Sequence, residues 1–496
     1  MPVGAAFSVR TVEPAAKERV EHDNYNHSPT MATFTDPLVF DPALIRRFDI
    51  NGPRYTSYPT ADRFGPEFDA DAYRRRLEIR RDNPLDRRPF SLYFHLPFCT
   101  TICYYCACNK IITKDHGRSA KYLKYLGREL ALQTGYLDPE DNAVEQLHWG
   151  GGTPTFLSHD EMRQLMDMTR RHFRLLDGGE YSIEVDPRKV DRATVDLLAE
   201  LGFNRMSLGV QDFDENVQKA VNRIQSEDET FAVIDAARAN GFKSISIDLI
   251  YGLPKQSVEG FDRTLDRVLS VNPDRLSIYN YAHLPTLFKP QRRILDVDLP
   301  SPDGRLHILS LAIEKLTAAG YVFIGMDHFA KPDDELAVAQ REGRLHRNFQ
   351  GYSTHSDCDM LSFGITSIGK VGATYSQNVK TLDEYYDRLD NGVLPVFRGI
   401  ELTPDDVLRR AIIQSLMCRF ELSFAAFEKA YGIEFTRHFS TELADLEEMA
   451  RAGLLRIEPG RIVVLSPGRM LVRAISMVFD ARLRANRPQN RYSKVI

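Results

Sequence analysis

The sequence predicts an α/β fold: a partial TIM-type (β/α)6 barrel with an N-terminal arm and a mostly helical, winged-helix-like C-terminal domain. Three observations predict it. Between residues 90 and 282, six short apolar runs alternate with amphipathic segments, the pattern of a parallel sheet covered by helices. Polar residues and glycines follow these runs, where a barrel gathers its reactive groups. From residue 403 onward the apolar period becomes helical.

The composition limits the class of protein. A chain of 496 residues is too long for one ordinary core, so we expect two or three domains. The net charge of −5 comes from interspersed signs, which gives no basic field for nucleic acid. No apolar run is long enough to span a bilayer. Six cysteines are too few for a disulfide scaffold, and the N-terminus lacks the features of a secretory signal, so we expect a soluble, cytoplasmic protein.

The chain begins with two segments that precede the barrel. Residues 1–40 carry scattered charge and few periodic apolar positions, so we expect a disordered extension there. Residues 41–89 form an N-terminal arm, with a short helix at 42–48. The glycine, prolines and aromatic residues at 52–60 indicate an ordered loop. This arm either packs against the core alone or also contacts the substrate.

Residues 90–300 are predicted to form the barrel. The expected strands are 90–95, 144–149, 181–185, 205–210, 244–250 and 275–280, and amphipathic segments lie at 122–136, 162–173 and 233–239. Residues 301–400 extend and cap this barrel. They contain an expected helix at 305–318, an apolar run at 321–324 and a loop-rich stretch at 326–372, whose length indicates a functional role.

Residues 401–496 have the element order of a winged-helix domain followed by a tail. The expected helices are 405–419, 424–430, 441–452 and 469–484, and a hairpin turns at residues 459–460. Nucleic-acid binding is disfavoured, because the third helix carries Glu442, Asp445, Glu447 and Glu448, which would repel phosphates. We interpret this domain as a lid or support for the barrel.

Four of the six cysteines, Cys99, Cys103, Cys106 and Cys108, lie within ten residues. A loop of this length can hold an iron–sulfur cluster, and three protein ligands on a four-iron cluster leave one iron open for chemistry. Structural zinc is disfavoured, because its ligands normally come from two separated pairs. A ferredoxin-type site would have a Cys-Pro pair nearby, and none follows the fourth cysteine.

The polar residues that end the predicted strands should point into one mouth, because the carboxyl ends of parallel strands lie at one rim. Along the chain they are Cys99, Gly150–Thr153, Glu184 with Asp186, Gln211, Asp248 and residues 281–283. Asp248 is the strongest of these on physical grounds. A carboxylate on an otherwise apolar strand needs a partner or a ligand.

The spacing Cys-x3-Cys-x-aromatic-Cys resembles the radical S-adenosyl-L-methionine (SAM) superfamily, in which SAM chelates the open iron of the cluster. Further stretches narrow the resemblance to oxygen-independent coproporphyrinogen III oxidases. They are residues 52–60, 93–98, 148–155, 183–187, 209–212, 248–254, 326–329 and 491–496, together with the extra Cys108. The resemblance runs from about Asp41 to the last residue.

This resemblance implies that Cys99, Cys103 and Cys106 bind one 4Fe-4S cluster. It also implies two SAM molecules in one active site. The positions that match first-SAM contacts are Tyr93, Tyr105, Gly151, Glu184 and Ile368, and those that match second-SAM contacts are Gly152, Thr153, Gln211, Arg223, Asp248 and Ala282.

The candidate catalytic residues are Tyr93, His95 and Cys108. Cys108 is expected to support the site rather than to bind the cluster. His95 follows Tyr93 by two residues and therefore shares its face of the strand, although a buried structural histidine fits this position equally well.

The implied reaction is the anaerobic oxidative decarboxylation of two propionate side chains of coproporphyrinogen III to vinyl groups, which gives protoporphyrinogen IX in haem biosynthesis. It would proceed through 5'-deoxyadenosyl radicals formed from SAM. Arg54, Arg347 and Arg491 are candidates to hold the substrate carboxylates. We expect a monomer that uses a cytoplasmic electron donor of flavodoxin or ferredoxin type and an unknown electron acceptor, with no nucleic-acid or membrane partner.

Two alternatives come from other classes of protein. Haem chaperones of the same superfamily bind haem instead of decarboxylating it, but as a rule they lack the fourth cysteine and the arm at residues 52–60. A transcription regulator that uses the winged helix is disfavoured by the acidic residues of its third helix.

Overall fold

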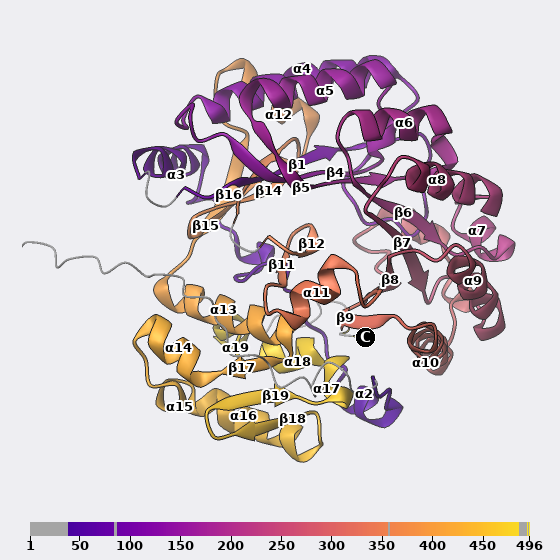
Figure 1. The fold of residues 1–496 in the computed structure, drawn as a ribbon, viewed down its shortest axis with the longest axis vertical. Helices are drawn as coiled ribbons and strands as arrows, with labels where there is room; N and C mark the ends of the chain where they lie inside the picture. The colour runs from indigo at the N-terminus through magenta and orange to yellow at the C-terminus, as the bar shows by residue number, and fades with distance from the viewer. Residues whose placement is uncertain (1–37, 84–86, 356–357, 486–493, 495) are drawn as a thin grey trace, which may run out of the picture.

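The computed structural model describes residues 38–83, 87–355, 358–485, 494 and 496 (Figure 1). The expectations for Arg491 and for residues 1–37 of the extension lie outside the described residues. Among the described helices, none is long and apolar enough to cross a membrane.

A twelve-stranded sheet forms the centre of the molecule, and six of its strands form the predicted partial barrel. These are β1 (Phe90–Leu96), β4 (Ala143–Gly151), β5 (Arg174–Val185), β6 (Arg205–Gln211), β7 (Ser244–Tyr251) and β8 (Arg275–Asn280). They are neighbours in chain order, and each pairs parallel with the next. The predicted arrangement is therefore confirmed, and the carboxyl ends of all six strands lie at one rim.

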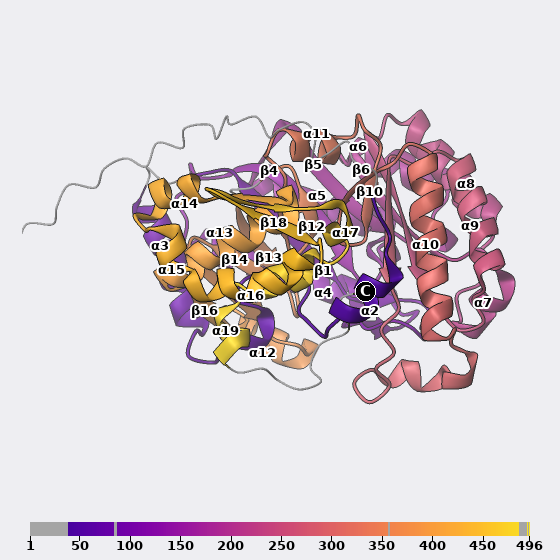
Figure 2. The same ribbon diagram turned by 90° about the horizontal axis from the view of Figure 1, so that it is seen from below.

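Helices cover the outer face of the parallel strands (Figures 1 and 2). They are α4 (His116–Thr134), α5 (His159–His172), α6 (Arg192–Glu200), α7 (Glu215–Ala220), α8 (Glu227–Ala239), α9 (Val258–Ser270) and α10 (Pro302–Ala318). Ser158 and Ser226 start α5 and α8 with capping boxes, in which a glutamate three residues later bonds back to the cap. The sequence analysis had not identified α6, α7 or α9.

Short elements complete the rim and the remaining connections. They are β2 (Phe98–Cys99), β3 (Ile111–Ile112), η1 (Ala61–Arg63), η3 (Pro154–Phe156), η4 (Pro187–Lys189), η5 (Lys289–Arg293) and η6 (Asp296–Asp298). The segment that carries the four cysteines, residues 99–108, is called the cysteine loop below. The parallel pair β2 and β3 brings its two ends together. The loop is thereby attached directly behind β1.

The interpretation of residues 326–372 as a loop-rich cap was wrong for much of this stretch. It contains β10 (His328–Ala330), α11 (Glu335–Arg341), β11 (His346–Asn348), β12 (Gly351–Ser353), β13 (Asp359–Phe363) and β14 (Ile368–Val371). β13 pairs parallel with β1. With β15 (Thr374–Asn378) and β16 (Val396–Glu401), it extends the sheet beyond the barrel strands, while β10 and β9 (Val322–Gly325) extend the other edge. These runs are too short to give a clear local signal, and their pairing partners are distant in the sequence.

Arg80 fastens the N-terminal arm to this extended sheet. It lies in α3 (Ala70–Asp82), is 7% exposed, and its guanidinium binds the carboxylates of Asp141 and Asp359. Asp359 is the first residue of β13, which pairs with β1. A buried guanidinium shared by two carboxylates therefore helps to fix the register at this edge of the barrel.

The C-terminal domain has the predicted three helices and hairpin. Its elements are α13 (Pro404–Arg419), β17 (Glu421–Ser423), α14 (Phe424–Tyr431), α15 (Phe435–His438), α16 (Ser440–Arg451), β18 (Leu455–Glu458) and β19 (Arg461–Val464). The predicted helix at 469–484 was wrong in form, because three short helices occupy this region: α17 (Ser466–Arg469), α18 (Val472–Met477) and α19 (Ala481–Ala485). Asp480 lies at the break between α18 and α19, where its carboxylate accepts a hydrogen bond of 2.9 Å from the Tyr55 hydroxyl of the arm.

The acidic residues of α16 contribute to packing within the chain. Glu442 is buried and pairs with Arg409 of α13 at 2.9 Å, while Glu448 pairs with Arg47 of α2 (Pro42–Phe48) at 2.8 Å. Figure 1 shows α2 lying against the C-terminal domain. These contacts join α16 to α13 within the domain and to the N-terminal arm.

Glu129 is a fully buried carboxyl that accepts hydrogen bonds from four donors. It lies on α4 and accepts from the Tyr385 hydroxyl of α12 (Leu382–Asp390), the Gly364 amide, and the side chains of Asn378 and Gln133. Its four donors come from α4, α12 and the β13–β15 region. One carboxyl thus joins an outer helix to the extension of the sheet. Burial raises the pKa of this carboxyl to about 7.

We expect Glu129→Gln to change how stability depends on pH. A carboxyl whose pKa rises from 4.5 to about 7 on folding stabilises the folded state fully below pH 4.5, and this contribution is lost as the pH rises to about 7. The thermal midpoint of the wild type should therefore fall relative to that of Glu129→Gln across this window, by the equivalent of about 3 kcal/mol. Melting curves of the two proteins that stay parallel from pH 4.5 to 8 would contradict this assignment.

Candidate active site

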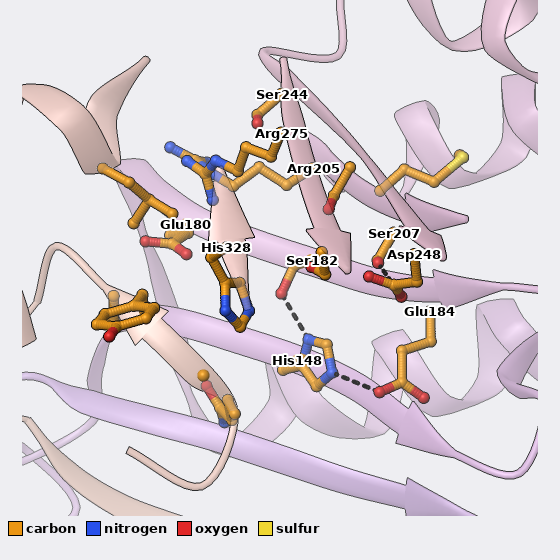
Figure 3. A pocket seen from close by; sticks show the side chains of 18 of the residues that line it. His148, Glu180, Ser182, Glu184, Arg205, Ser207, Ser244, Asp248, Arg275 and His328 are labelled. Atoms are coloured by element: carbon orange, nitrogen blue, oxygen red, sulfur yellow. Dashed lines mark hydrogen bonds and ion pairs between the residues drawn. The ribbon is translucent and has the colours of Figure 1, made fainter. Parts of the chain in front are cut away.

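The barrel lumen is lined by polar side chains from alternating positions of the strands. Figure 3 shows Ser182 and Glu184 of β5, Ser207 of β6 and Asp248 of β7 directed into one cavity of about 160 Å³. Residues between them, such as Ile247, are fully buried on the opposite face of the strands. Because side chains alternate along a strand, the sheet packs its apolar face against the helices and its polar face around the cavity.

Glu184 of β5 is held at the rim by two residues of the neighbouring strand β4. His148 of β4 places its Nε2 3.5 Å from one carboxylate oxygen, and its Nδ1 lies 2.7 Å from the Ser182 hydroxyl (Figure 3). The Gly151 amide donates to the other carboxylate oxygen at 3.0 Å. Burial alone would raise the pKa of Glu184, but the interactions with His148 and Gly151 outweigh it and lower the pKa. The group is therefore a carboxylate at neutral pH.

Asp248, the carboxylate predicted to need a hydrogen-bond partner on its apolar strand, has one in Ser207. The Ser207 hydroxyl donates to it at 2.8 Å across the β6–β7 pairing. Burial raises the pKa of Asp248 to about 6, and its hydrogen bonds with Ser207 and Ser277 act in the opposite direction. The remaining capacity of this carboxylate faces the cavity, where a ligand donor can reach it.

Tyr93 and His95 share a face of β1, as predicted. The Tyr93 hydroxyl lies 3.1 Å from His95 Nδ1, and His95 Nε2 lies 3.2 Å from the Asn109 carbonyl. Burial lowers the pKa of His95, so the neutral ring can donate to Asn109 and accept from Tyr93. A Cβ at Gly151, where φ is +119°, would lie 2.7 Å from His95 Nδ1, which explains the glycine.

The cysteine loop lies at the same rim and is surrounded by donors. The Thr153 hydroxyl is 3.4 Å from Cys99 Sγ. Arg223 Nη1 and Arg188 Nη2 lie 3.7 and 4.0 Å from Cys103 Sγ. The chain therefore sets two guanidinium groups beside Cys103 and a hydroxyl beside Cys99. Burial still raises the pKa of Cys99 to about 11, although the Thr153 hydrogen bond acts in the opposite direction.

Cys106 and Cys108 lie side by side. A hydrogen bond with the Cys108 thiol is the main cause that lowers the pKa of Cys106 to about 6, and the Lys110 ammonium lowers it further. Lys110 also donates to the carbonyls of both cysteines. Cys108 therefore lies in direct contact with one of the three predicted ligands.

These residues fit an iron–sulfur cluster held by thiolates. All three predicted ligand sulfurs have hydrogen-bond donors, and two arginines balance the negative charge that such a group carries. Among the described residues, no group of three His, Cys, Asp or Glu side chains could hold a single metal ion. The ligands of a single metal ion converge on one centre, whereas each cysteine of a four-iron cluster binds a different iron.

The structure brings most other predicted residues to this rim. Gln211, with φ of +71°, ends β6, and a Cβ on the neighbouring Gly209 would lie 2.8 Å from its amide nitrogen and 3.2 Å from Arg223. Gly152 donates its amide to the Leu96 carbonyl, which joins β4 to β1. The other predicted positions near the rim are Tyr105, Thr153 and Ala282.

Three predicted residues lie on segments other than the cysteine loop and the barrel strands. Ile368 is on β14, which β13 separates from β1, and it packs beside the Tyr375 cluster. Arg54 pairs with Asp327 at 2.9 Å. Arg347, on β11, lies 5.3 Å above the ring of Tyr352, which lines the cavity.

Sequence reasoning missed several residues that the structure places in the site. His148 supports Glu184, Arg188 lies beside Cys103 and pairs with the predicted rim residue Asp186, and His328 lines the cavity. A signal for His148 existed, because it precedes Gly150 by two residues on the same strand face. For Arg188 and His328 the local sequence holds no comparable sign, since their contacts come from other segments.

The comparisons with known proteins agree with this geometry. The family model of the radical SAM superfamily matches residues 93–268, and that of the HemN C-terminal domain matches residues 402–471. The first covers the barrel strands β1 to β7 and the cysteine loop, and the second covers the winged-helix-like elements.

Curated relatives match almost the whole chain. The oxygen-independent coproporphyrinogen III oxidase of Pseudomonas aeruginosa is 53% identical over 467 residues, which cover 93% of this chain and 100% of the relative. That of Escherichia coli is 48% identical over 459 residues, with 92% and 99% covered.

A solved structure extends the likeness to the fold. It is coproporphyrinogen III oxidase (HemN) from Escherichia coli, described as a radical SAM enzyme, and it matches with a TM-score of 0.85 at 47% identity, covering 90% of this chain and all of that one. A radical SAM enzyme implies a 4Fe-4S cluster and SAM. The chain belongs to the family of oxygen-independent coproporphyrinogen III oxidases.

Proposed function

We propose that this protein converts two propionate side chains of coproporphyrinogen III into vinyl groups without oxygen, which gives protoporphyrinogen IX for haem biosynthesis. The observation that carries the proposal is the convergence of the cysteine loop with Glu184 and Asp248 at one mouth of a polar lumen. When bound, the cluster and SAM supply an organic radical that removes a hydrogen atom from the propionate β-carbon. Loss of carbon dioxide and of one electron to an acceptor then leaves the vinyl group.

Within this proposal the cysteine loop holds the cluster. Cys99, Cys103 and Cys106 are its ligands, and Cys108 supports Cys106. Arg188 and Arg223 stay beside Cys103 because both also bind Asp186. They offset the negative charge of the thiolates and of the bound group.

The rim carboxylates and glycines would bind SAM. Glu184 is a preorganised acceptor for an ammonium or a ribose hydroxyl, since His148 and the Gly151 amide fix its orientation. We propose two SAM molecules, as the family resemblance implies. The first would contact Tyr93, Tyr105, Gly151, Glu184 and Ile368, and the second Gly152, Thr153, Gln211, Arg223, Asp248 and Ala282. The adjacency of Gln211 to Arg223 supports the second set.

Tyr93 and His95 act as positioning residues in this scheme. The Tyr93 hydroxyl bonds His95, which in turn bonds the Asn109 carbonyl, and the Tyr93 ring also stacks on His148 at 5.8 Å. His148 lines the lumen next to Glu184, and its stacking with Tyr93 helps to fix its orientation.

Arg347 is the strongest candidate to hold a substrate carboxylate. It is 5% exposed, and its Nε and Nη1 have no hydrogen-bond partner. Buried donors in a folded protein are normally satisfied, so this guanidinium suits an anion. Its neighbour Tyr352 lines the cavity and packs on His328, with ring centroids 5.2 Å apart.

Two further arginines make this region strongly cationic. Arg54 pairs with Asp327, the residue before His328, and Arg473 donates to the carbonyls of Gly52 and Pro53 beside Arg54. Burial lowers the pKa of Arg473 to about 10, and the charges of Arg54 and Arg347 add to this effect. An anionic ligand would relieve this repulsion.

The hairpin of Arg347 closes the lumen away from the cysteine loop. Ser353 accepts from Gln146 of β4 at 2.6 Å, and Thr354 donates to Glu180 of β5 at 3.3 Å, both nearer the strand starts than the rim residues. A carboxylate held there lies far from the radical source. We therefore assign Arg347 to the propionates that stay in the product.

The reaction is tested by anaerobic incubation of the reconstituted protein with SAM, dithionite and coproporphyrinogen III. We expect mass spectrometry to show loss of two carbon dioxide molecules from the tetrapyrrole, together with formation of methionine. Intact SAM with tightly retained haem would instead indicate a haem-binding function.

Single Cys→Ser variants test the ligand assignment. Changes at Cys99, Cys103 or Cys106 should each abolish retention of iron and sulfide after reconstitution, because three thiolates hold the cluster. Cys108→Ser serves as the matched control and should retain the visible absorption of the wild type. Loss of the cluster from Cys108→Ser as well would make Cys108 a ligand.

Arg347→Met tests the carboxylate site with two porphyrins. Coproporphyrin III has four carboxylates, and protoporphyrin IX has the two that stay in the product. Both porphyrins should bind to Arg347→Met about 10- to 100-fold more weakly than to the wild type, since the variant loses one or two charged hydrogen bonds. Arg344→Met, an exposed change in the same segment, should bind both like the wild type. Weaker binding of coproporphyrin III alone would place a reacting propionate at Arg347, and unchanged binding of both would exclude the contact.

A further inference from the structure

The segment between β8 and α10 covers the cysteine loop from outside the barrel. Gln291 donates to the Tyr105 carbonyl at 3.0 Å, and Arg293 donates to the Tyr104 hydroxyl at 3.0 Å. Ile294 is buried in a small apolar cluster against which both tyrosines pack. In Figure 2 this segment projects from the barrel below α10 and beside α7.

A second segment, after α7, holds the other side of the same loop. The Tyr104 amide donates to the Val221 carbonyl at 2.9 Å, and the Asn222 side chain donates to the Ile102 carbonyl at 2.7 Å. Val221 also belongs to the apolar cluster that contains Ile294. The cysteine loop therefore lies directly beneath these two segments, which we call the loop cover (residues 221–224 and 284–299).

The loop cover exposes large apolar side chains. Ile224, Leu287, Leu295 and Val297 are 57%, 65%, 59% and 85% exposed. These are four of the ten large exposed hydrophobic side chains in the described part of the chain, although the loop cover is only 20 residues long. Single exposed apolar residues are ordinary, but such a concentration indicates an interaction surface.

The loop cover is also positively charged. Lys289, Arg292 and Arg293 are exposed, and none of them has an ion-pair partner among the described residues. The two acidic residues of the segment do not balance them, because Asp298 pairs with Lys255 at 2.5 Å and only Asp296, 3.1 Å from the imidazole of His283, remains. This patch thus carries excess positive charge on a chain whose net charge is −5.

We propose that the loop cover is the docking surface for a small acidic protein that carries single electrons on a flavin or an iron–sulfur group. This inference rests on the proposed function, in which each SAM cleaved takes up one electron from outside the protein. The carrier undergoes a one-electron oxidation. Its electron enters the protein through the cysteine loop beneath the patch. The basic residues attract the acidic partner, and the apolar residues give the contact area of a transient redox complex.

The test compares a charge-reversal variant with a matched control, using bacterial flavodoxin as the probe. Lys289→Glu with Arg292→Glu alters the patch and leaves the contact of Arg293 with Tyr104 intact. Lys429→Glu with Arg437→Glu makes the same charge change on exposed residues of the C-terminal domain, at the far end of the molecule in Figure 2. A third variant, Leu287→Ser with Val297→Ser, removes apolar contact area and no charge.

Two quantities are measured on the reconstituted proteins: the Kd for flavodoxin over a range of salt, and the rate at which reduced flavodoxin bleaches the cluster absorption. We expect the patch reversal to raise Kd about tenfold or more at low salt and to flatten its salt dependence. The serine variant should raise Kd at every salt concentration, and the control should behave like the wild type. SAM cleavage driven by dithionite should be unchanged in all of them, because a small reductant needs no docking surface.

Other outcomes overturn the inference. Equal Kd values for the patch reversal and its control would show that flavodoxin binds elsewhere. Loss of the dithionite-driven reaction in the patch variants would mean that these residues only support the cysteine loop. A wild-type dimer in sedimentation that the patch reversal dissociates would assign the surface to a second copy of the chain. Failure of the wild type to cleave SAM with dithionite would contradict the proposed function alone, since flavodoxin binding is measured separately.

Discussion

The polar lining of the barrel lumen is the constraint on which the rest of this structure depends. A parallel sheet normally buries apolar residues on both faces, whereas here one face carries carboxylates, hydroxyls, imidazoles and guanidinium groups. Each of them must be satisfied away from water. Neighbouring strands pair Glu184 with His148 and Asp248 with Ser207, and Asp334, which caps α11, pairs with Arg275 of β8. Correct strand register is therefore a condition for a stable lumen as well as for the site.

The elements outside the barrel close this lumen and fix its edges. Arg80 and Glu129 fasten the arm and the outer helices to β13, which completes the barrel beside β1. The β11–β12 hairpin covers the side near the strand starts. In the same region Arg347 has two buried donors without partners and no carboxylate partner among the described residues, whereas Arg275 has one such donor and pairs with Asp334. This contrast separates a structural charge from one that suits a ligand.

The cysteine loop lies where the lumen meets the outer surface. On one side Glu184 and Thr153 connect it to the cavity, and on the other Gln291 and Val221 connect it to the loop cover. This position suits a group that must meet substrate from inside and receive electrons from outside. Because the two sides use different residues, substrate binding and electron delivery can be changed separately.

The sequence by itself determined the features that depend on local pattern. The six barrel strands, the helices of the C-terminal domain and the rim residues Cys99, Glu184 and Asp248 follow from periodicity and from polar residues at strand ends. The motif residues also predicted the family to which the chain belongs, and the comparisons confirmed this prediction.

Only the tertiary structure decided the features that join segments far apart in the chain. The strand β13, the breaks within residues 466–485 and the support of Glu184 by His148 all depend on such contacts. The loop cover and the unpartnered donors of Arg347 likewise arise where distant segments pack together. Periodicity reports how a residue relates to its neighbours in the chain, whereas burial and charge balance are set by whatever the fold places beside it.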